Sequence, residues 1–159
     1  MELAVKTFQE LTADELYELL RLRAEVFVVE QTCVYQDLDG KDRAALHLLL
    51  REGETLQAYA RVLPAGTAFP TAGLGRVCTR SRGRGLGRAV VAAGIRAARE
   101  KLGAEEITIE AQSYVRGLYE GFGFRQSSEE FLEDGIPHIQ MKWKLQADGQ
   151  RPPIGGEPV

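Results

Sequence analysis

The apolar residues of this chain recur in two different patterns, and these patterns divide it into expected strands and helices. A long segment, 86–102, carries apolar residues at helical spacing, and Gly103 follows it in the position of a C-cap glycine. A shorter helix is expected over 114–121. Six short runs have the length and composition of β-strands: 3–8, 44–51, 55–63, 74–79, 107–111 and 139–145. Strands and helices that share one core predict a mixed α/β or α+β layer architecture.

A first helix is expected to begin after Thr12. Thr12 and Glu15 have the spacing of a capping box, and Leu11 and Leu16 occupy the positions of a hydrophobic staple. Apolar residues at helical spacing then continue the pattern as far as Phe27.

Length and composition are those of one ordinary globular domain. The chain has 159 residues, of which 44% are hydrophobic and 27% are charged. We expect the domain to cover 1–147 and the tail 148–159, rich in Pro and Gly, to be disordered. No apolar run approaches the roughly 20 residues of a membrane helix, and the N-terminus lacks the layout of a signal peptide. We therefore expect a cytoplasmic protein without a membrane partner.

The cysteines and the net charge exclude further classes of function. Cys33 and Cys78 are expected to be free thiols in a reducing compartment, and they do not form the pattern of a metal site. A net charge of −3 argues against a general affinity for nucleic acid.

Positive charge is concentrated in one part of the chain. No acidic residue occurs between Glu54 and Glu100, a stretch in which there are eight arginines: Arg61, Arg76, Arg80, Arg82, Arg84, Arg88, Arg96 and Arg99. One basic segment in an acidic protein favours a local anion-binding site. The alternative interpretation is a solvated basic face.

The centre of this segment is a glycine-rich turn between an expected strand and the long helix. Gly83, Gly85 and Gly87 allow the backbone to approach a ligand closely, and the helix that follows offers unpaired N–H groups and the positive end of its dipole. Such a turn can bind phosphate.

The arginines of the turn support the same interpretation. Arg82, Arg84 and Arg88 have the wrong sign for a bare helix N-terminus, where acidic residues are favoured, and a bound polyanion would remove the misfit. The turn lacks the residue order of a P-loop, and it lacks the Gly-x-Gly-x-x-Gly order of a dinucleotide-binding turn.

The sequence Arg82-x-x-Gly85-x-Gly87 resembles the pyrophosphate-binding motif of the GNAT superfamily of N-acetyltransferases. A second segment, 111–124, is similar to the GNAT segment that ends in Leu-Tyr-x-x-x-Gly-Phe, although Gln112 stands where the family usually has Asn. Further similarity to the ElaA-like branch of the family occurs at 26–31, Tyr35, 39–42 and 134–138.

This resemblance implies a single GNAT-type domain with a mixed, mostly antiparallel sheet of about seven strands and about four helices. The strands 74–79 and 107–111 would splay apart, and the thioester of acetyl-coenzyme A (acetyl-CoA) would lie between them. The residues that the resemblance implies for cofactor binding are Val77, Cys78, Thr79, Arg82, Gly83, Arg84, Gly85, Leu86, Gly87, Arg88 and Gln112.

By the same resemblance, Tyr119 is the catalytic acid that protonates the departing thiolate of coenzyme A (CoA). The alternative is a helix tyrosine packed on the core. No general base is evident in the sequence, and Glu30 and His138 are candidates for a base or for substrate binding. Glu110 is expected to face solvent, and His47 to be a core histidine.

Cys78 is expected to be inert, because nothing near it in the sequence resembles an activating histidine. The function predicted is therefore acetyl transfer from acetyl-CoA to an amine by direct attack in a ternary complex. The alternatives are a non-catalytic CoA-binding or regulatory module and an acyltransferase that uses longer chains. The acceptor would be a small-molecule or peptide amine, and the sequence leaves monomer and homodimer open.

Overall fold

Eight strands form one mixed sheet in the computed structural model, which describes residues 1–146. The tail expected over 148–159 to be disordered lies outside the described residues. The strand order is β1-β2-β3-β4-β5-β8-β6, and β7 also pairs with β8. The strands are β1 (Glu2–Thr7), β2 (Leu46–Glu52), β3 (Thr55–Leu63), β4 (Ala72–Thr79), β5 (Glu106–Gln112), β6 (Arg125–Gln126), β7 (Phe131–Glu133) and β8 (Ile136–Lys144).

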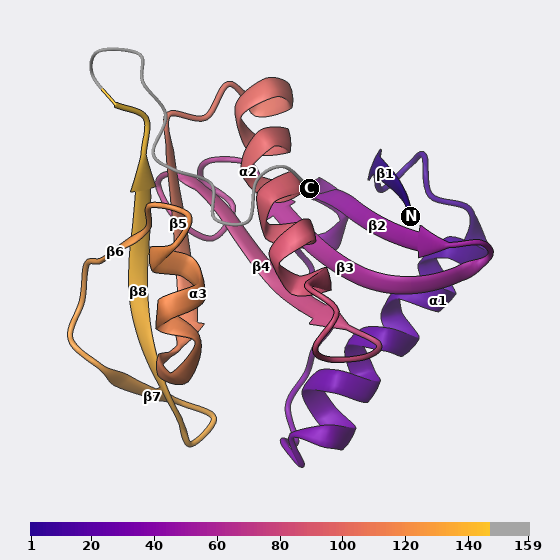
Figure 1. Ribbon diagram of the computed structural model, residues 1–159, viewed down its shortest axis with the longest axis horizontal. Coiled ribbons are helices and arrows are strands. Elements are labelled where there is room, and N and C mark those ends of the chain that lie inside the picture. The colour runs from indigo at the N-terminus through magenta and orange to yellow at the C-terminus, as the bar shows by residue number, and fades with distance from the viewer. Residues whose placement is uncertain (147–159) are drawn as a thin grey trace.

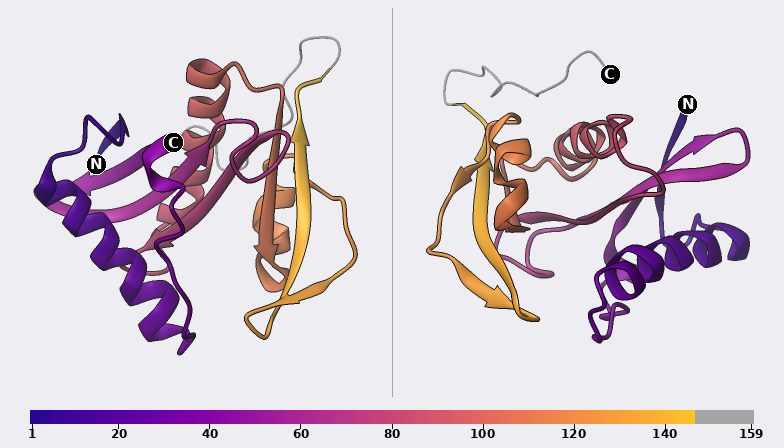
Figure 2. Two further views of the ribbon diagram at one scale, coloured as in Figure 1. Left: turned by 180° about the vertical axis from the view of Figure 1, so that it is seen from behind. Right: turned by 60° about the horizontal axis from the view of Figure 1, so that its bottom comes forward.

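The described residues contain three α-helices and three helical segments of other types. The α-helices are α1 (Ala13–Arg23), α2 (Leu86–Leu102) and α3 (Arg116–Glu120); the others are a π-helix η1 (Ala24–Glu30) and the 3₁₀ turns η2 (Asp42–Ala44) and η3 (Ser113–Val115). Helix α1 covers one face of the sheet, and α2 and α3 lie on the other (Figures 1 and 2). The mixed sheet confirms the expected fold class, with one strand more and one α-helix fewer than expected.

The central strands are buried on both faces, and this explains why β2 has a nearly continuous apolar sequence. Leu48 and Leu50 pack in the core beneath α2, whereas Leu49 between them packs with Leu19 and Leu22 of α1. Successive side chains of a strand point to opposite faces, so each layer of helices receives its own set.

The start of α1 is the one that the sequence predicts. Thr12 accepts a hydrogen bond from the backbone of Glu15, and the Glu15 carboxylate accepts one from the backbone of Thr12. Leu11 and Leu16 both pack against the core beneath α1. The predicted helical pattern that reaches Phe27 is divided, because the chain widens into the π-helix η1 directly after Arg23.

Helix α2 begins and ends at the predicted residues. Gly103 caps it in the left-handed conformation, with φ +63°. Within the helix, a Cβ atom at Gly94 would lie 2.7 Å from Leu74 Cδ1, so glycine allows α2 to lie close to β4. This close packing fixes the N-terminus of α2 at the carboxyl end of β4.

Strands β4 and β5 are neighbours in the sheet but pair over only two positions. They are parallel, and only Ala72 with Ile107 and Gly73 with Thr108 form partners. From Leu74 onward β4 bonds to β3 alone, while β5 bonds to β8 along its whole length. The sheet therefore splits between these two strands, as the family resemblance implies.

Two short strands, β6 and β7, were not predicted. Within residues 1–146, each pairs only with β8, through Arg125 and Gln126 in β6 and through 131–133 in β7. Their sequences are too short to show a period, and the long edge of β8 supplies the hydrogen bonds that define them.

His47 is a core histidine, as predicted. Its Nδ1 accepts a hydrogen bond from the Tyr59 hydroxyl at 2.6 Å, and its Nε2 donates one to the Asp42 carbonyl at 2.8 Å. Burial of the ring lowers the pKa of His47 below its usual value of 6.5.

This lowered pKa predicts a loss of stability on mild acidification. Below pH 6.5 the unfolded chain binds a proton at His47 that the folded protein does not, so the free energy of unfolding falls with decreasing pH until the folded-state pKa is reached. The slope from this one group is at most about 1.4 kcal/mol per pH unit. Urea unfolding at pH 7.5 and 5.5 should show it, and a His47→Gln variant should lose that part of the pH dependence. An identical dependence in the variant would contradict this account.

Candidate active site

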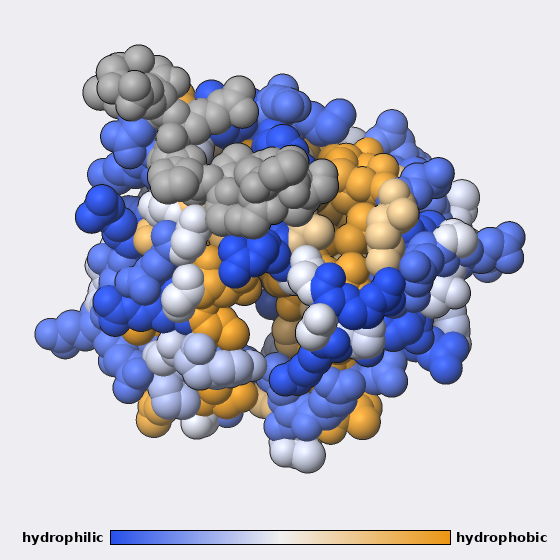
Figure 3. Space-filling model, viewed as in Figure 1, coloured by the Kyte–Doolittle hydropathy of each residue, from blue (hydrophilic) through white to orange (hydrophobic). Residues whose placement is uncertain are grey.

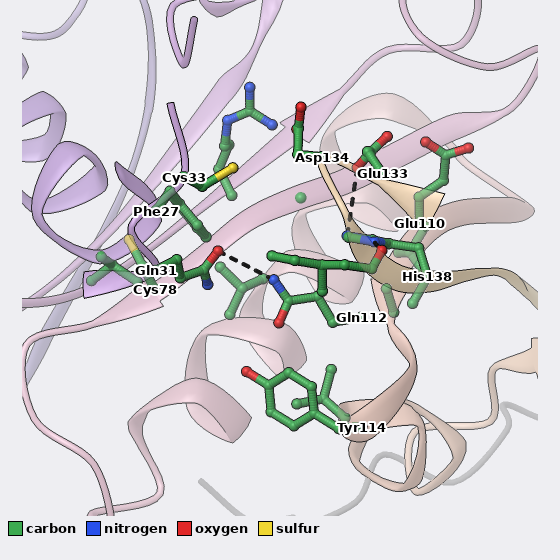
Figure 4. A pocket seen from close by; sticks show the side chains of 18 of the residues that line it. Phe27, Gln31, Cys33, Cys78, Glu110, Gln112, Tyr114, Glu133, Asp134 and His138 are labelled. Carbon is green, nitrogen blue, oxygen red and sulfur yellow. Dashed lines mark hydrogen bonds and ion pairs between the residues drawn. The ribbon is translucent and has the colours of Figure 1, made fainter. Parts of the chain in front are cut away.

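A cavity of about 290 Å³ occupies the split between β4 and β5. Its walls come from β4, β5, η1 and the segment after it, α3, and the turn between β7 and β8. The surface is hollowed at this place, between α3 and the turn that precedes α2 (Figure 3). A close view shows Phe27 and Gln31 on one side of the cavity and Glu133 and His138 on the other (Figure 4).

One wall is the edge of β4 that β5 leaves unpaired. Val77, Cys78 and Thr79 line the cavity; among the described strands only β3 pairs with Cys78 and Thr79, and Val77 has no partner in the register. Backbone groups along a free strand edge can form hydrogen bonds with an extended ligand such as the pantetheine arm of CoA.

The glycine-rich turn continues from this edge to the N-terminus of α2. Gly83 and Gly85 are left-handed, with φ +79° and +73°, and a Cβ atom at either would meet nothing within 4 Å. Gly85 is the N-cap, and no described side chain caps it. Gly87 lies inside α2 and has no positive φ.

These features match the chemistry of a pyrophosphate. The first N–H groups of α2 have no intrahelical partner, no acidic residue stands in its first turn, and the space beside the turn is open. Leu86 is buried beneath the turn and anchors it to the core. The turn and the free edge of β4 therefore fit CoA.

Tyr119 of α3 carries the most distinctive side chain of the cavity. It is 8% exposed, and its hydroxyl forms no hydrogen bond with any residue between 1 and 146. The ring packs edge-on against Phe124, with 5.7 Å between centroids. Burial raises the pKa of Tyr119 to about 12. Because this hydroxyl oxygen is not among the fully buried polar atoms that lack a partner, it reaches the open space of the cavity, where a ligand could bond to it.

Comparison with known proteins agrees with this geometry. The model of the acetyltransferase (GNAT) domain family matches residues 8–145. Protein ElaA of Escherichia coli is 37% identical over 136 residues, which are 83% of this chain and 89% of ElaA. The chain belongs to the GNAT acetyltransferase family.

Solved structures of similar proteins place the chain in the ElaA-like branch of that family. An acyl-CoA N-acyltransferase from Pseudomonas aeruginosa superposes with a TM-score of 0.84 at 38% identity, covering 89% of this chain and 99% of that one. The crystal structure of E. coli ElaA gives a TM-score of 0.83 at 34% identity with the same coverage. The chain is therefore an acyltransferase that uses an acyl-CoA.

The arginines of the GNAT turn differ in their surroundings. Arg82, Arg84 and Arg88 are all exposed, and of these three only Arg82 lines the cavity. Arg84 forms a long ion pair of 3.3 Å with Glu52, and the guanidinium of Arg88 lies over the ring of Phe122 at 5.8 Å. Phosphate binding by these three side chains stays a prediction.

Gln112 faces the cavity from the end of β5. Its side-chain amide donates a hydrogen bond of 3.3 Å to the Gln31 side chain, across the cavity (Figure 4). Gln112 thus connects β5 to the segment after η1. A contact between Gln112 and the cofactor stays a prediction.

Both candidates for substrate binding, Glu30 and His138, also line the cavity. His138 is 7% exposed, and its Nδ1 donates a hydrogen bond of 2.7 Å to the Ile136 carbonyl. This bond leaves the lone pair of the neutral ring on Nε2, which lies 3.5 Å from a carboxylate oxygen of Glu133. Glu110 is exposed, as expected, but its side chain also borders the cavity (Figure 4).

Sequence reasoning missed an ionic cluster that holds one wall of the cavity. Asp37 accepts hydrogen bonds from the buried Arg23, at 2.9 Å, and from the cavity residue Arg76, at 2.8 Å. Asp39 and Asp42 bind Arg61 in the same cluster, at 2.8 and 3.0 Å. The cluster fixes the polar segment 33–42, where the sequence offered only the resemblance to the ElaA-like branch at Tyr35 and 39–42 and no indication of ion pairs.

Within residues 1–146, no helix is long and apolar enough to cross a membrane.

Proposed function

We propose that this protein transfers the acetyl group of acetyl-CoA to a small-molecule amine by direct attack in a ternary complex. One observation carries the proposal. The free edge of β4, Arg82 at the start of the glycine turn and Tyr119, whose hydroxyl has no described partner, line a single cavity. At about 290 Å³ this cavity is at the small end of ligand sites, which favours acetyl over a long acyl chain when the acceptor must enter as well.

In the proposed reaction, the amine nitrogen bonds to the acyl carbon while the carbon–sulfur bond breaks. The sulfur leaves as a thiolate and takes the hydroxyl proton of Tyr119. The usual thiol pKa of about 8.5 would make this transfer from a phenol unfavourable. Burial raises the pKa of Tyr119 to about 12, so the hydroxyl keeps its proton at neutral pH and can donate it to the sulfur only as the negative charge develops there.

The amine must also lose a proton, and we assign this step to His138. Its Nε2 carries the free lone pair, and Glu133 next to it would stabilise the protonated ring. The raised pKa of Cys78 keeps that residue a thiol at neutral pH, which argues against an acyl-cysteine intermediate.

Binding of acetyl-CoA is expected to stabilise the folded protein. At about 100 times its dissociation constant, a ligand that binds only the folded state adds about 2.7 kcal/mol to the free energy of unfolding. Thermal unfolding with acetyl-CoA or CoA measures this gain. Pantetheine, which lacks the pyrophosphate, should give a smaller shift at equal concentration. The proposal fails if saturating acetyl-CoA leaves the unfolding temperature unchanged.

A further inference from the structure

Three carboxylates form one side of the cavity, at a distance from the glycine turn. Glu110 lies on β5, and Glu133 and Asp134 lie where β7 turns toward β8. The close view shows the three side chains gathered above His138 (Figure 4). We call these residues, Glu110, Glu133 and Asp134, the acidic wall.

The negative charge of the acidic wall is not balanced by the described protein. No lysine lines the cavity, and no lysine or arginine within 1–146 forms an ion pair with any of the three carboxylates. Arg76 lines the cavity but is bound by Asp37 and Asp39. Arg82 belongs to the turn, where the phosphates are expected. Among residues 1–146, only His138 forms an ion pair or hydrogen bond with a side chain of the wall, through Glu133.

Two members of the wall, Glu110 and Glu133, are close enough to affect one another. Burial, together with the charge of Glu133, raises the pKa of Glu110 above its usual value. A cation placed between the two carboxylates would relieve this repulsion.

A second observation, independent of the acidic wall, points to a ligand in the cavity. Tyr119 is more than nine-tenths buried, lines the same cavity and has no hydrogen-bond partner among the described residues. The cavity thus has two places for a ligand. One is the reacting position, near Tyr119 and the free edge of β4, and the other is the negatively charged acidic wall.

We propose that the acceptor is a small dicationic amine, in which one nitrogen receives the acetyl group while a second, protonated nitrogen is bound by Glu110, Glu133 and Asp134. This inference rests on the proposed function and adds the class of substrate. The non-reacting ammonium remains protonated at neutral pH, so it keeps its ion pairs throughout the reaction. Simple aliphatic diamines have the required chemistry.

Three acceptors with the same four-carbon chain test the proposal: 1,4-diaminobutane, 1-aminobutane and 4-aminobutanoate. They differ at the fourth carbon, which carries an ammonium group, is a methyl group, or is a carboxylate carbon. Release of free thiol from acetyl-CoA gives kcat/KM for each. We expect the diamine to exceed 1-aminobutane at least about tenfold, and 4-aminobutanoate to be the poorest. Equal values for the diamine and the monoamine would overturn the proposal and leave the acetyltransferase function in place.

Two variants test whether the acidic wall causes the preference for the diamine. Glu110→Gln and Asp134→Asn each remove one charge, and asparagine tolerates the left-handed backbone of position 134, where φ is +51°. Glu133 is left unchanged because it contacts His138. Each variant should lower the advantage of the diamine several-fold and leave the rate with 1-aminobutane unchanged. The control Glu105→Gln makes the same charge change just before β5, away from the cavity lining, and should have no effect.

A binding measurement separates this proposal from the proposed function. Calorimetry compares the dissociation constants of 1,4-diaminobutane and 1-aminobutane, for the protein alone and with CoA. If the diamine binds more tightly than the monoamine and this difference shrinks in Glu110→Gln, the acidic wall is supported even when no amine is acetylated. In that case only the proposed function would fail. Equal or absent binding of the two amines together with no preference in turnover would overturn the inference.

Discussion

Replacing Gly85 by valine is expected to weaken acetyl-CoA binding at least about 100-fold and to leave a folded protein. Gly85 is left-handed, with φ +73°, and a Cβ atom there would meet no protein atom within 4 Å. A new side chain would therefore project into the open space where the pyrophosphate is expected. A residue other than glycine also costs about 1–2 kcal/mol in this conformation, so the turn would tend to move its N–H groups away. Calorimetric titration with acetyl-CoA measures the loss, and circular dichroism checks the fold.

The other end of the same helix offers a matched control. Gly103 is also left-handed, with φ +63°, and a Cβ atom there also meets nothing within 4 Å. Gly103→Val should therefore cost a similar amount of stability while acetyl-CoA binding stays intact. If the Gly85 and Gly103 variants bound acetyl-CoA equally well, the glycine turn would not be the phosphate site.

Replacing Tyr119 by phenylalanine is expected to lower kcat on the order of 10²-fold with little change in KM for acetyl-CoA. The hydroxyl is needed only when negative charge develops on the leaving sulfur, so its loss raises the barrier without weakening binding of the substrate. The loss should lie at the low end for acid catalysis, because a thiolate leaves fairly easily without help. The ring and its edge-on contact with Phe124 remain. The hydroxyl has no hydrogen bond to lose, so the free energy of unfolding should change little.

Steady-state kinetics with a saturating amine measure this effect, and Tyr17→Phe is the control. Tyr17 is 73% exposed on α1 and does not line the cavity. Its loss of a hydroxyl should leave kcat unchanged. A Tyr119→Phe enzyme with the rate of the wild type would show that Tyr119 only packs in the core, and that another group or water protonates the thiolate.

Local features of the fold were predictable because their causes lie within a few residues. The capping box at Thr12, the bounds of α2 and its cap at Gly103 depend on hydrogen bonds inside one helix and the turns beside it. The glycine turn is equally local, since its conformation needs only the glycines themselves and the helix that follows. The sequence therefore determined both the family and the element that fits the pyrophosphate.

Features that join distant segments were not predictable from residue patterns. The resemblance to a known family supplied the split between β4 and β5, which is a matter of pairing between strands and leaves no periodic mark in either one. The partner of β6 and β7 is the edge of β8, and three residues or fewer are too short to predict a strand alone.

The charged residues around the cavity show most clearly the difference between local features, which the sequence predicts, and features that join distant segments. Glu110 alternates with apolar residues in the sequence and was expected only to face solvent, and nothing near it indicated Glu133 or Asp134. Arg76 counted as one more basic residue until the structure placed it against Asp37. The position of a residue in a strand or helix determines whether its side chain faces solvent, and the pattern of apolar residues in the sequence predicts this. Which charges face one another depends on the pairing of β5 with β8 and of β8 with β7, and only the tertiary structure decides that.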